Sequence, residues 1–447
     1  MSRPVVELAM IVRNGSASLA RAISSALPAV DRVIIGDTGS TDDSVAIAKS
    51  LGAHVFDVPW EDDFSKARNT VLQACRGEWI LILDADEMLD PAGASKIPLL
   101  AMQTQVDAWE IWKWHYIRTL TSRCGAEPAR ANPNVLEESR SYPAYTQSLS
   151  TLFFRRRPDL YFEYEVHETV SKRARELRLK VAAAPFVIHH FGHAEDTDLQ
   201  RQQKLERYHQ MGIHKVQVYP QDYWAHYELG LSEFEHRRNP QMALVSFENA
   251  LKLNPEFHAA WIYAGICLTR LGRLAQALEY LNHGEDGGRP NALLYEAKGD
   301  VFFYSGDYAQ AAHQYQLGGH GADMSPLVAC KLGACEVKQG KAADGLARIQ
   351  EGVEREPQAA ALYDIWVAAA MLCGDLRTAA KVAERRLRVG QPSIDSFVVA
   401  AGLQARLNRW NLAVSTLLQG MQEYPDDARL RREWKLAVDR ASSLAPE

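Results

Sequence analysis

The sequence of 447 residues has little excess charge and no long hydrophobic run. Its net charge is only −6, whereas a nucleic-acid-binding protein usually has a strongly basic domain, so we expect no nucleic-acid partner. No apolar run reaches the roughly 18 residues that a spanning helix needs, so we expect no transmembrane segment. Glu7 interrupts the apolar run near the N-terminus and no cleavage pattern follows it. We therefore interpret this run as a strand rather than a signal peptide and expect a cytoplasmic protein.

Paired cysteines are also missing. None of the six lies in a C-x-x-C pair, which excludes zinc-ribbon and thioredoxin-type motifs. Four fall in segments with a helical repeat pattern, so we interpret the cysteines as small buried residues in a reducing compartment. They are Cys75, Cys124, Cys267, Cys330, Cys335 and Cys373.

The first ninety residues alternate between strand and helix patterns. Strands are predicted at residues 6–12, 33–35, 55–58 and 79–83, with helices at 18–27, 44–51 and 64–75. The strands are apolar on both faces, which is typical of a parallel sheet covered by helices. Ligands bind such sheets where the strands end, and three polar clusters fall at those ends. They are Arg13-Asn14, residues 37–43 and residues 84–87, so one nucleotide-type site is predicted.

The pattern changes between residues 105 and 190. Alternation over residues 109–114 predicts a strand, and shorter strands are expected at 152–154, 161–164 and 186–190. Residues 121–148 are polar and contain prolines, so they are interpreted as a loop over the site. We expect this half of the domain to build the acceptor side.

From about residue 222 the sequence repeats. Gly272, Gly306, Gly340, Gly374 and Asn408 are each 34 residues apart, and small residues recur between them at a similar period. A small residue where two helices cross, followed by a turn residue, is the pattern of tetratricopeptide repeats. About six helical hairpins are predicted, and their stacking leaves a concave groove.

The segment Asp84-Ala85-Asp86-Glu87 follows a buried strand. Carboxylates on such a turn are hard oxygen ligands that suit Mn²⁺ or Mg²⁺, and the ion in turn bridges a diphosphate. The alternative is a solvated turn followed by a helix cap at Asp90 and Pro91.

Two further groups have an alternative structural interpretation. Asp37, before Gly39, can accept hydrogen bonds from a base or ribose, although the 37–43 turn also caps a helix. Arg68 faces the donor phosphates or braces the Asp84 turn, and its alternative is a structural ion pair inside the site.

In these motifs the sequence resembles family 2 glycosyltransferases of the GT-A fold. It is most similar to a bacterial branch, including protein S-glycosyltransferases, that joins such a domain to tetratricopeptide repeats. The resemblance implies an α/β, Rossmann-like mixed sheet in residues 1–215 and an all-α repeat solenoid in residues 216–447. The matching segments are residues 10–14, 37–42, 60–69, 79–87, Val166-His167-Glu168 and His190-Phe191-Gly192-His193. Gly15-Ser16 and His193 depart from the branch's pattern.

The resemblance also implies roles for these residues. Asp37 holds the nucleoside, Asp84 contacts ribose or metal, Asp86 is the main metal ligand, and His190 is a further ligand. Arg13, Asn14 and Arg68 complete the donor side. Glu168 is the candidate base, with His167 orienting it or acting itself; the alternative is that these two form a structural pair.

The expected activity is inverting transfer of a sugar from a nucleotide-diphosphate donor, most often UDP-linked in this family. The acceptor is a protein, peptide or glycan, and the repeats recruit it or form a homodimer. One alternative is a degenerate sugar-nucleotide-binding scaffold whose repeats bind proteins. A nucleotidyltransferase is disfavoured because Arg13-Asn14-Gly15-Ser16 is not the Gly-rich, Arg-containing loop that it needs.

Overall fold

The computed structural model describes residues 3–118, 123–124, 127–195, 198–285, 292–319 and 324–443. The chain divides into two compact units, of which the first runs to Ala260 and the second begins at Trp261. Across the described ranges, no helix combines the length and the apolar character that crossing a lipid bilayer requires.

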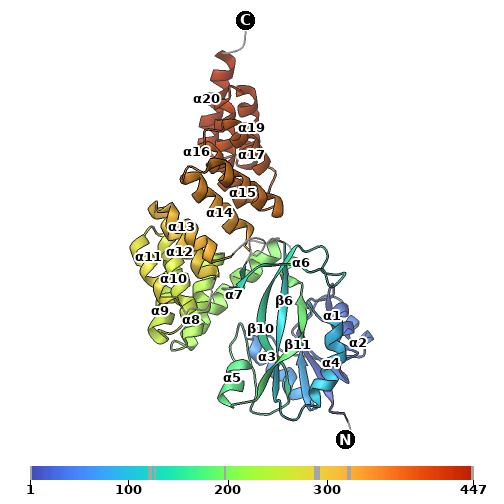
Figure 1. The fold of residues 1–447 in the computed structure, drawn as a ribbon. Helices are drawn as coiled ribbons and strands as arrows, with labels where there is room; N and C mark the ends of the chain where they lie inside the picture. Colours follow the sequence, from blue (N-terminus) through green and yellow to red (C-terminus); the bar gives the residue numbers. More distant parts are fainter. Residues whose placement is uncertain are drawn as a thin grey trace. The chain divides into compact units, whose positions relative to one another are not determined.

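A mixed β-sheet forms the centre of the first unit (Figure 1). Its strand order is β3-β2-β1-β4-β10-β6-β11-β5, with β9 paired to β10. The first four strands in this order are parallel, β10 is antiparallel to both β4 and β6, β11 is parallel to β6, and β5 is antiparallel to β11. The strands are β1 (Val6–Val12), β2 (Arg32–Asp37), β3 (His54–Asp57), β4 (Trp79–Ile82), β5 (Glu87–Leu89), β6 (Ala108–Ile117), β9 (Arg130–Ala131), β10 (Ala144–Arg155) and β11 (Val181–His190). A separate hairpin pairs β7 (Arg123–Cys124) with β8 (Glu127–Pro128).

Helices cover this sheet and bury its apolar strands. Helix α3 packs against β1 and β2, whereas α1 packs against β5 and α4 against β11. The core contains the fully buried residues Leu8, Ile35, Trp79 and Phe153. The helices of this part are α1 (Leu19–Ala26), α2 (Ser44–Ser50), α3 (Phe64–Ala74), α4 (Pro91–Ala101), α5 (Ser171–Glu176), α6 (Gly192–Glu195) and α7 (Asp198–Val218).

The predicted elements up to residue 83 are confirmed to within about two residues, but two later predictions are wrong. Residues 144–148 were expected in a loop and instead begin β10, because they pair with residues 113–117 of β6. Residues 161–164 were expected as a strand, but they form only one isolated bridge, between Glu163 and Thr169. The positive φ of Tyr164, 78°, breaks the extended chain there. Part of the expected loop, residues 121–122 and 125–126, lies outside the described ranges.

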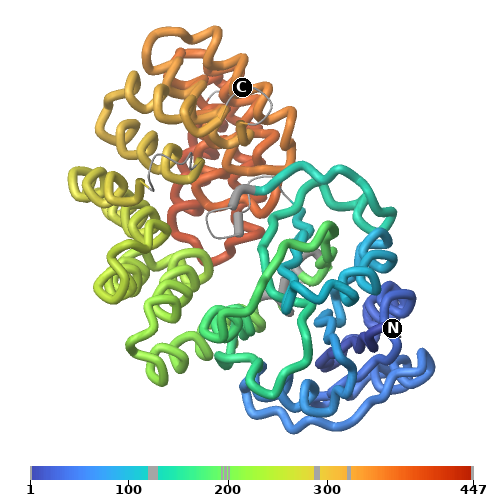
Figure 2. Tube along the Cα trace, turned by 60° about the horizontal axis from the view of Figure 1, so that its bottom comes forward, coloured from blue at the N-terminus to red at the C-terminus, as the bar shows by residue number. Residues whose placement is uncertain are grey.

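Helical hairpins make up the rest of the chain. In the first unit α8 and the short helix η1 pack against α9, and in the second unit successive hairpins stack in chain order (Figure 2). The bounds are α8 (Tyr223–Leu231), η1 (Ser232–His236), α9 (Pro240–Leu253), α10 (His258–Arg270), α11 (Leu274–His283), α12 (Ala292–Ser305), α13 (Tyr308–Leu317), α14 (Pro326–Lys338), α15 (Ala342–Arg355), α16 (Ala360–Leu372), α17 (Leu376–Arg386), α18 (Ile394–Arg406), α19 (Trp410–Glu423) and α20 (Ala428–Ser443).

The backbone explains the 34-residue period of small and turn residues. Gly272, Gly306, Gly340 and Gly374 have φ between 72° and 87°, the left-handed conformation that ends a helix. Where helices cross, a Cβ on Gly299 would come 2.3 Å from the Tyr315 ring. The repeat pattern therefore places one residue that tolerates a positive φ at the turn between helices, and one small residue where two helices cross closely.

Candidate functional site

The predicted polar clusters lie at one edge of the sheet. Strands β2, β1 and β4 are neighbours and parallel, so their C-terminal ends meet there. Asp37 ends β2, Arg13 and Asn14 follow β1, and Asp84 follows β4 within two residues. The structure therefore brings these candidate residues to the same end of the sheet.

Asp37 anchors the turn after β2 and leaves one oxygen without a partner. Its Oδ2 accepts hydrogen bonds from the backbone N–H groups of Gly39 and Ser40, at 3.1 and 3.0 Å. The residue is 5% exposed, and its buried Oδ1 has no hydrogen-bond partner among the described residues. A buried carboxylate oxygen without a donor is costly, so a ligand donor fits this position.

The residues after β1 support the same turn. Asn14 has a φ of 54°, and its Oδ1 accepts a hydrogen bond from the backbone N–H of Thr41 at 2.8 Å. Asp42 accepts from the backbone N–H groups of Ser16 and of Ser44, the first residue of α2. Arg13 is exposed beside this turn. Asn14 therefore stabilises the turn that follows Asp37.

The buried carboxylate of Glu87 stabilises the turn that begins at Asp84. Glu87 is 1% exposed; its Oε2 accepts from the backbone N–H of Asp84 at 2.9 Å, and its Oε1 lies 2.5 Å from Nζ of Lys113. Lys113, on β6, also lies 3.8 Å from Oδ2 of Asp84. Glu87 thus fixes the turn rather than facing a ligand.

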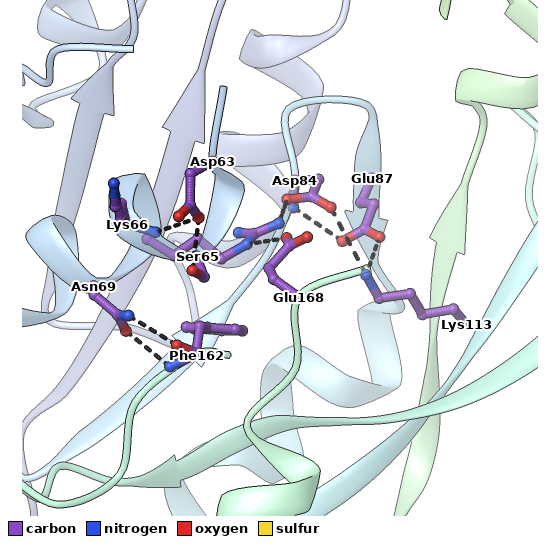
Figure 3. Close-up of polar contacts among 10 residues, drawn as sticks. Asp63, Ser65, Lys66, Asn69, Asp84, Glu87, Lys113, Phe162 and Glu168 are labelled. Atoms are coloured by element: carbon purple, nitrogen blue, oxygen red, sulfur yellow. Dashed lines mark hydrogen bonds and ion pairs between the residues drawn. The ribbon is translucent and has the colours of Figure 1, made fainter. Parts of the chain in front are cut away.

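Arg68 joins the two halves of the site. Its Nη2 donates to Oδ1 of Asp84 at 2.7 Å, and its Nε donates to Oε1 of Glu168 at 2.5 Å. Figure 3 shows the carboxylates of Asp84 and Glu168 near each other, with Glu87 and Lys113 beyond Asp84. Burial raises the pKa of Asp84, but Arg68 and Lys113 outweigh it and bring the pKa below its ordinary value. This geometry agrees with bracing of the Asp84 turn by Arg68 and equally with a structural ion pair inside the site.

Asp86 lies next to His190, the last residue of β11. Nε2 of His190 is 3.3 Å from Oδ2 of Asp86, and its Nδ1 is 2.7 Å from Nδ1 of His115. Nε2 of His115 in turn lies 2.8 Å from Oγ of Ser148. Burial raises the pKa of Asp86, but the charge and hydrogen bond of His190, with smaller effects from Lys204 and Lys113, hold it well below its usual range. Asp86 therefore stays ionised at neutral pH.

The donor chemistry of Asp86 and His190 fits a divalent cation. A carboxylate and an imidazole are suitable ligands for Mn²⁺, and the remaining positions suit phosphate oxygens and water. Asp84, the third expected ligand, faces Arg68 and Lys113 instead. Among the described residues, no group of three or more His, Cys, Asp or Glu side chains is arranged to hold a metal.

The Val166-His167-Glu168 segment brings the candidate base to this edge. Glu168 reaches Arg68, whereas His167 is exposed, has a φ of 53°, and lies with its ring centroid 6.2 Å from that of Tyr208 on α7. Helix α7 also carries Lys204, whose charge acts on Asp86.

Several residues of the site were not singled out in the sequence. Lys113 and His115 lie two residues apart on the same face of β6, and only the pairing of β6 with β10 and β11 brings them to Asp84 and His190. Lys204 and Tyr208 come from a helix without a sequence motif. The weak signal for Lys113 is its place between Trp112 and Trp114.

Two segments match known families. Residues 8–103 match Glycosyl transferase family 2, and residues 227–290 match the tetratricopeptide repeat. The first match includes Asp37, Arg68, Asp84 and Asp86. The second begins within α8, so it starts in the first compact unit and extends into the second.

Relatives share parts of the chain. A TPR repeat-containing protein of Synechococcus elongatus is 30% identical over 65% of this chain, an uncharacterized glycosyltransferase of Rickettsia felis is 45% identical over 18%, and the SPbeta prophage-derived glycosyltransferase SunS of Bacillus subtilis is 31% identical over 22%. These matches span 59%, 28% and 24% of the relatives' own lengths. The chain thus combines a segment that matches family 2 glycosyltransferases, within a mixed sheet consistent with the GT-A fold, with a segment that matches tetratricopeptide repeats.

Proposed function

We propose that this protein is an inverting glycosyltransferase that moves a sugar from a UDP-linked or related nucleotide-diphosphate donor to a polypeptide or glycan acceptor. The observation that carries the proposal is the Arg68 bridge, which holds Asp84 on the donor side and Glu168 on the acceptor side. Arg68 thus keeps Asp84, on the donor side, at a fixed distance from the candidate base Glu168. Such fixed spacing suits a direct displacement, in which the acceptor attacks the sugar as the diphosphate leaves.

The donor-binding end uses Asp37 and Asp86. Oδ1 of Asp37 is positioned to accept a hydrogen bond from the base or ribose, because it is buried and unpartnered. Asp86 and His190 would hold Mn²⁺ or Mg²⁺, and the bound ion would offset the negative charge that develops on the leaving diphosphate.

Glu168 acts on the acceptor. Its carboxylate takes the proton from the acceptor O–H or S–H group, and the acceptor atom attacks the anomeric carbon as the bond from that carbon to the diphosphate oxygen breaks. The nucleoside diphosphate leaves with the bonding pair, and the configuration at the anomeric carbon inverts. His167, exposed beside Glu168, is placed to orient the acceptor or to share the base role.

A thermal-shift experiment tests the donor site. The intact protein is heated with Mn²⁺ and a panel of nucleoside diphosphates and sugar nucleotides, since binding to the native state raises the melting temperature. We expect a metal-dependent shift with one nucleotide that Asp86→Asn abolishes. Coupled release of the nucleoside diphosphate in the presence of an acceptor then tests transfer.

A second candidate is a scaffold that binds sugar nucleotides without transferring sugar. The observation in its favour is that Asp84 is held by two cations rather than facing a ligand. A nucleotide-dependent shift without transfer to any acceptor would support the scaffold, and the absence of any shift would count against both candidates.

The second unit offers a surface for a polypeptide acceptor. A cavity of about 750 Å³ lies among α12, α13, α14 and α16, and a neighbouring one of about 380 Å³ shares Asp364, Ala368 and Met371 with it. Tyr304 and Leu372, both lining the larger cavity, are 68% and 56% exposed. An open, mainly apolar groove of this kind suits an extended peptide with apolar side chains.

Homodimerisation is the competing role for this groove. Sizing of the protein and of Tyr304→Ser measures the oligomeric state, and titration with synthetic peptides that contain Ser, Thr or Cys next to apolar residues measures binding. Peptide affinity that the substitution weakens supports recruitment. A dimer that the substitution dissociates, without peptide binding, overturns it.

A further inference from the structure

A fully buried lysine connects the first repeat hairpin to the segment that carries Glu168. Lys215, near the C-terminal end of α7, is 0% exposed. Its Nζ lies 2.6 Å from Oε2 of Glu228 on α8 and donates to the main-chain carbonyl of Val166 at 3.3 Å. The same ammonium lies 3.9 Å from the centroid of the Tyr164 ring. An acidic, a carbonyl and an aromatic partner thus compensate its burial.

The segment that Lys215 contacts has an unusual backbone. Tyr164 and His167 have φ values of 78° and 53°, which non-glycine residues rarely adopt. Glu163 and Thr169 exchange backbone hydrogen bonds at 3.1 and 3.2 Å, so the residues between them form a closed loop. Such a conformation persists only where surrounding contacts hold it.

Helix α3 holds the other side of this loop. Asn69 exchanges two hydrogen bonds with the backbone of Phe162, at 2.9 and 2.8 Å, as Figure 3 shows. The backbone N–H of Phe64 donates to the carbonyl of Glu165 at 2.9 Å. Contacts from α3 and from Lys215 therefore fix the loop on both sides of Val166, two residues before Glu168.

We infer that Lys215, held by Glu228, is a positioning residue for Glu168. It fixes the carbonyl of Val166 and the ring of Tyr164, and thereby sets the path of the chain that presents Glu168 to Arg68. The effect on catalysis rests on the proposed function, in which Glu168 is the base. The inference also makes the first repeat hairpin a structural part of the active site, because Glu228 belongs to α8.

Substitutions of Lys215 and of Glu228 leave different unpaired groups in the protein. Replacing Glu228 leaves a fully buried lysine without its counter-charge. Lys215→Met keeps an apolar stem of similar length and leaves the charge on Glu228, whose side chain is 13% exposed and still accepts a hydrogen bond from Nε1 of Trp224. Lys215→Met is therefore the variant that best separates positioning from unfolding. Glu228→Gln, which keeps the shape of the side chain, is the second variant if Lys215→Met fails to fold.

Lys298→Met is a matched control in the second unit. Lys298 is 6% exposed and pairs with Glu285, whose side chain is 55% exposed, so its replacement removes one buried lysine charge far along the chain from Glu168. A general loss of stability would affect both variants in the same way. A positioning effect would appear only in Lys215→Met.

The experiment measures hydrogen–deuterium exchange and steady-state kinetics on the full-length protein. In Lys215→Met we expect faster exchange across residues 163–169 and a kcat lower by roughly tenfold to hundredfold, as small misplacements of a catalytic group produce. The affinity for UDP with Mn²⁺ should stay unchanged, because Asp37 and Asp86 are not touched. Lys298→Met should show none of these changes.

Two outcomes would overturn the inference. One is unchanged exchange in residues 163–169 of Lys215→Met, and the other is unchanged kcat despite faster exchange. If the unmodified protein transfers no sugar, the proposed function fails on its own. Faster exchange confined to residues 163–169 in Lys215→Met would then still support the structural role of Lys215.

Discussion

Gly192 lies so close to Asp86 that a Cβ atom at position 192 would come 2.0 Å from Oδ2 of that carboxylate. The backbone N–H of Phe191 also donates to the carbonyl of Asp86 at 3.1 Å. The chain leaving β11 therefore packs directly against the residue proposed as the main metal ligand. The glycine in the His190-Phe191-Gly192-His193 motif is explained by this close approach.

Gly192→Ala should displace the Asp86 side chain and weaken donor binding. The added methyl group cannot fit at 2.0 Å, so either the carboxylate rotates or α6 moves away. We expect an increase of at least about tenfold in the Kd for the nucleotide with Mn²⁺, which corresponds to about 1.4 kcal/mol. Calorimetric titration measures it.

Gly402→Ala is the control for this substitution. Gly402 lies within α18 and is exposed, and an added Cβ would meet no atom within 4 Å, so alanine fits there. Because alanine favours a helix over glycine by about 0.5–1 kcal/mol, this variant should melt slightly higher and bind nucleotide normally. Equal nucleotide affinity in both variants would contradict the role of Gly192.

Asp37→Asn should weaken nucleotide binding without destabilising the fold. Asparagine still offers one oxygen to the N–H groups of Gly39 and Ser40, but its amide would replace the unpartnered Oδ1 with a donor. Losing a hydrogen bond to a charged group costs about 1.5–3 kcal/mol, so we expect affinity for UDP to fall roughly tenfold to a hundredfold. A melting temperature of the free protein equal to that of the parent, with unchanged affinity, would contradict the assignment.

The sequence predicts the edge of the sheet that carries Asp37 and Asp84 well because its signals are local. Strand periodicity, the polar residues after β1, β2 and β4, and the spacing of Gly272 and Gly306 each depend on a few neighbouring residues. The parallel order of these strands then brings Asp37 and Asp84 to one edge without further information.

The part of the sheet formed by β6, β10 and β11 depends on contacts between distant segments. Lys113 reaches the Asp84 turn only through the register of β6 against β10 and β11, and residues 144–148 are a strand only because β6 pairs with them. The loop around Glu168 is held by Lys215, whose sequence neighbourhood has no motif. Periodicity within one segment contains no information about such partners.

The buried cysteines should resist alkylation in the native protein. Burial raises the pKa of the thiols of Cys75, Cys267, Cys330 and Cys335 to about 12. Only the thiolate reacts, so iodoacetamide at about pH 8 should leave these four unmodified until denaturant restores an ordinary pKa near 8.5. Peptide mass spectrometry after labelling measures this, with the half-buried Cys373 as an internal reference. Labelling of all four in the native state would contradict their burial.

Truncation should show where the catalytic part of the chain ends. The boundary expected from the sequence follows residue 215, yet the first compact unit extends to Ala260. A chain ending at residue 215 keeps Lys215 but removes Glu228, its counter-charge, together with the helices that cover it. An unpaired buried charge destabilises a protein by about 3–5 kcal/mol, so this fragment should aggregate or melt without cooperativity.

A chain ending at residue 260 retains the ion pair and the hairpin of α8 and α9, and should unfold in one cooperative transition by circular dichroism. Equal stability of the two fragments would mean that the first hairpin contributes nothing to the catalytic unit.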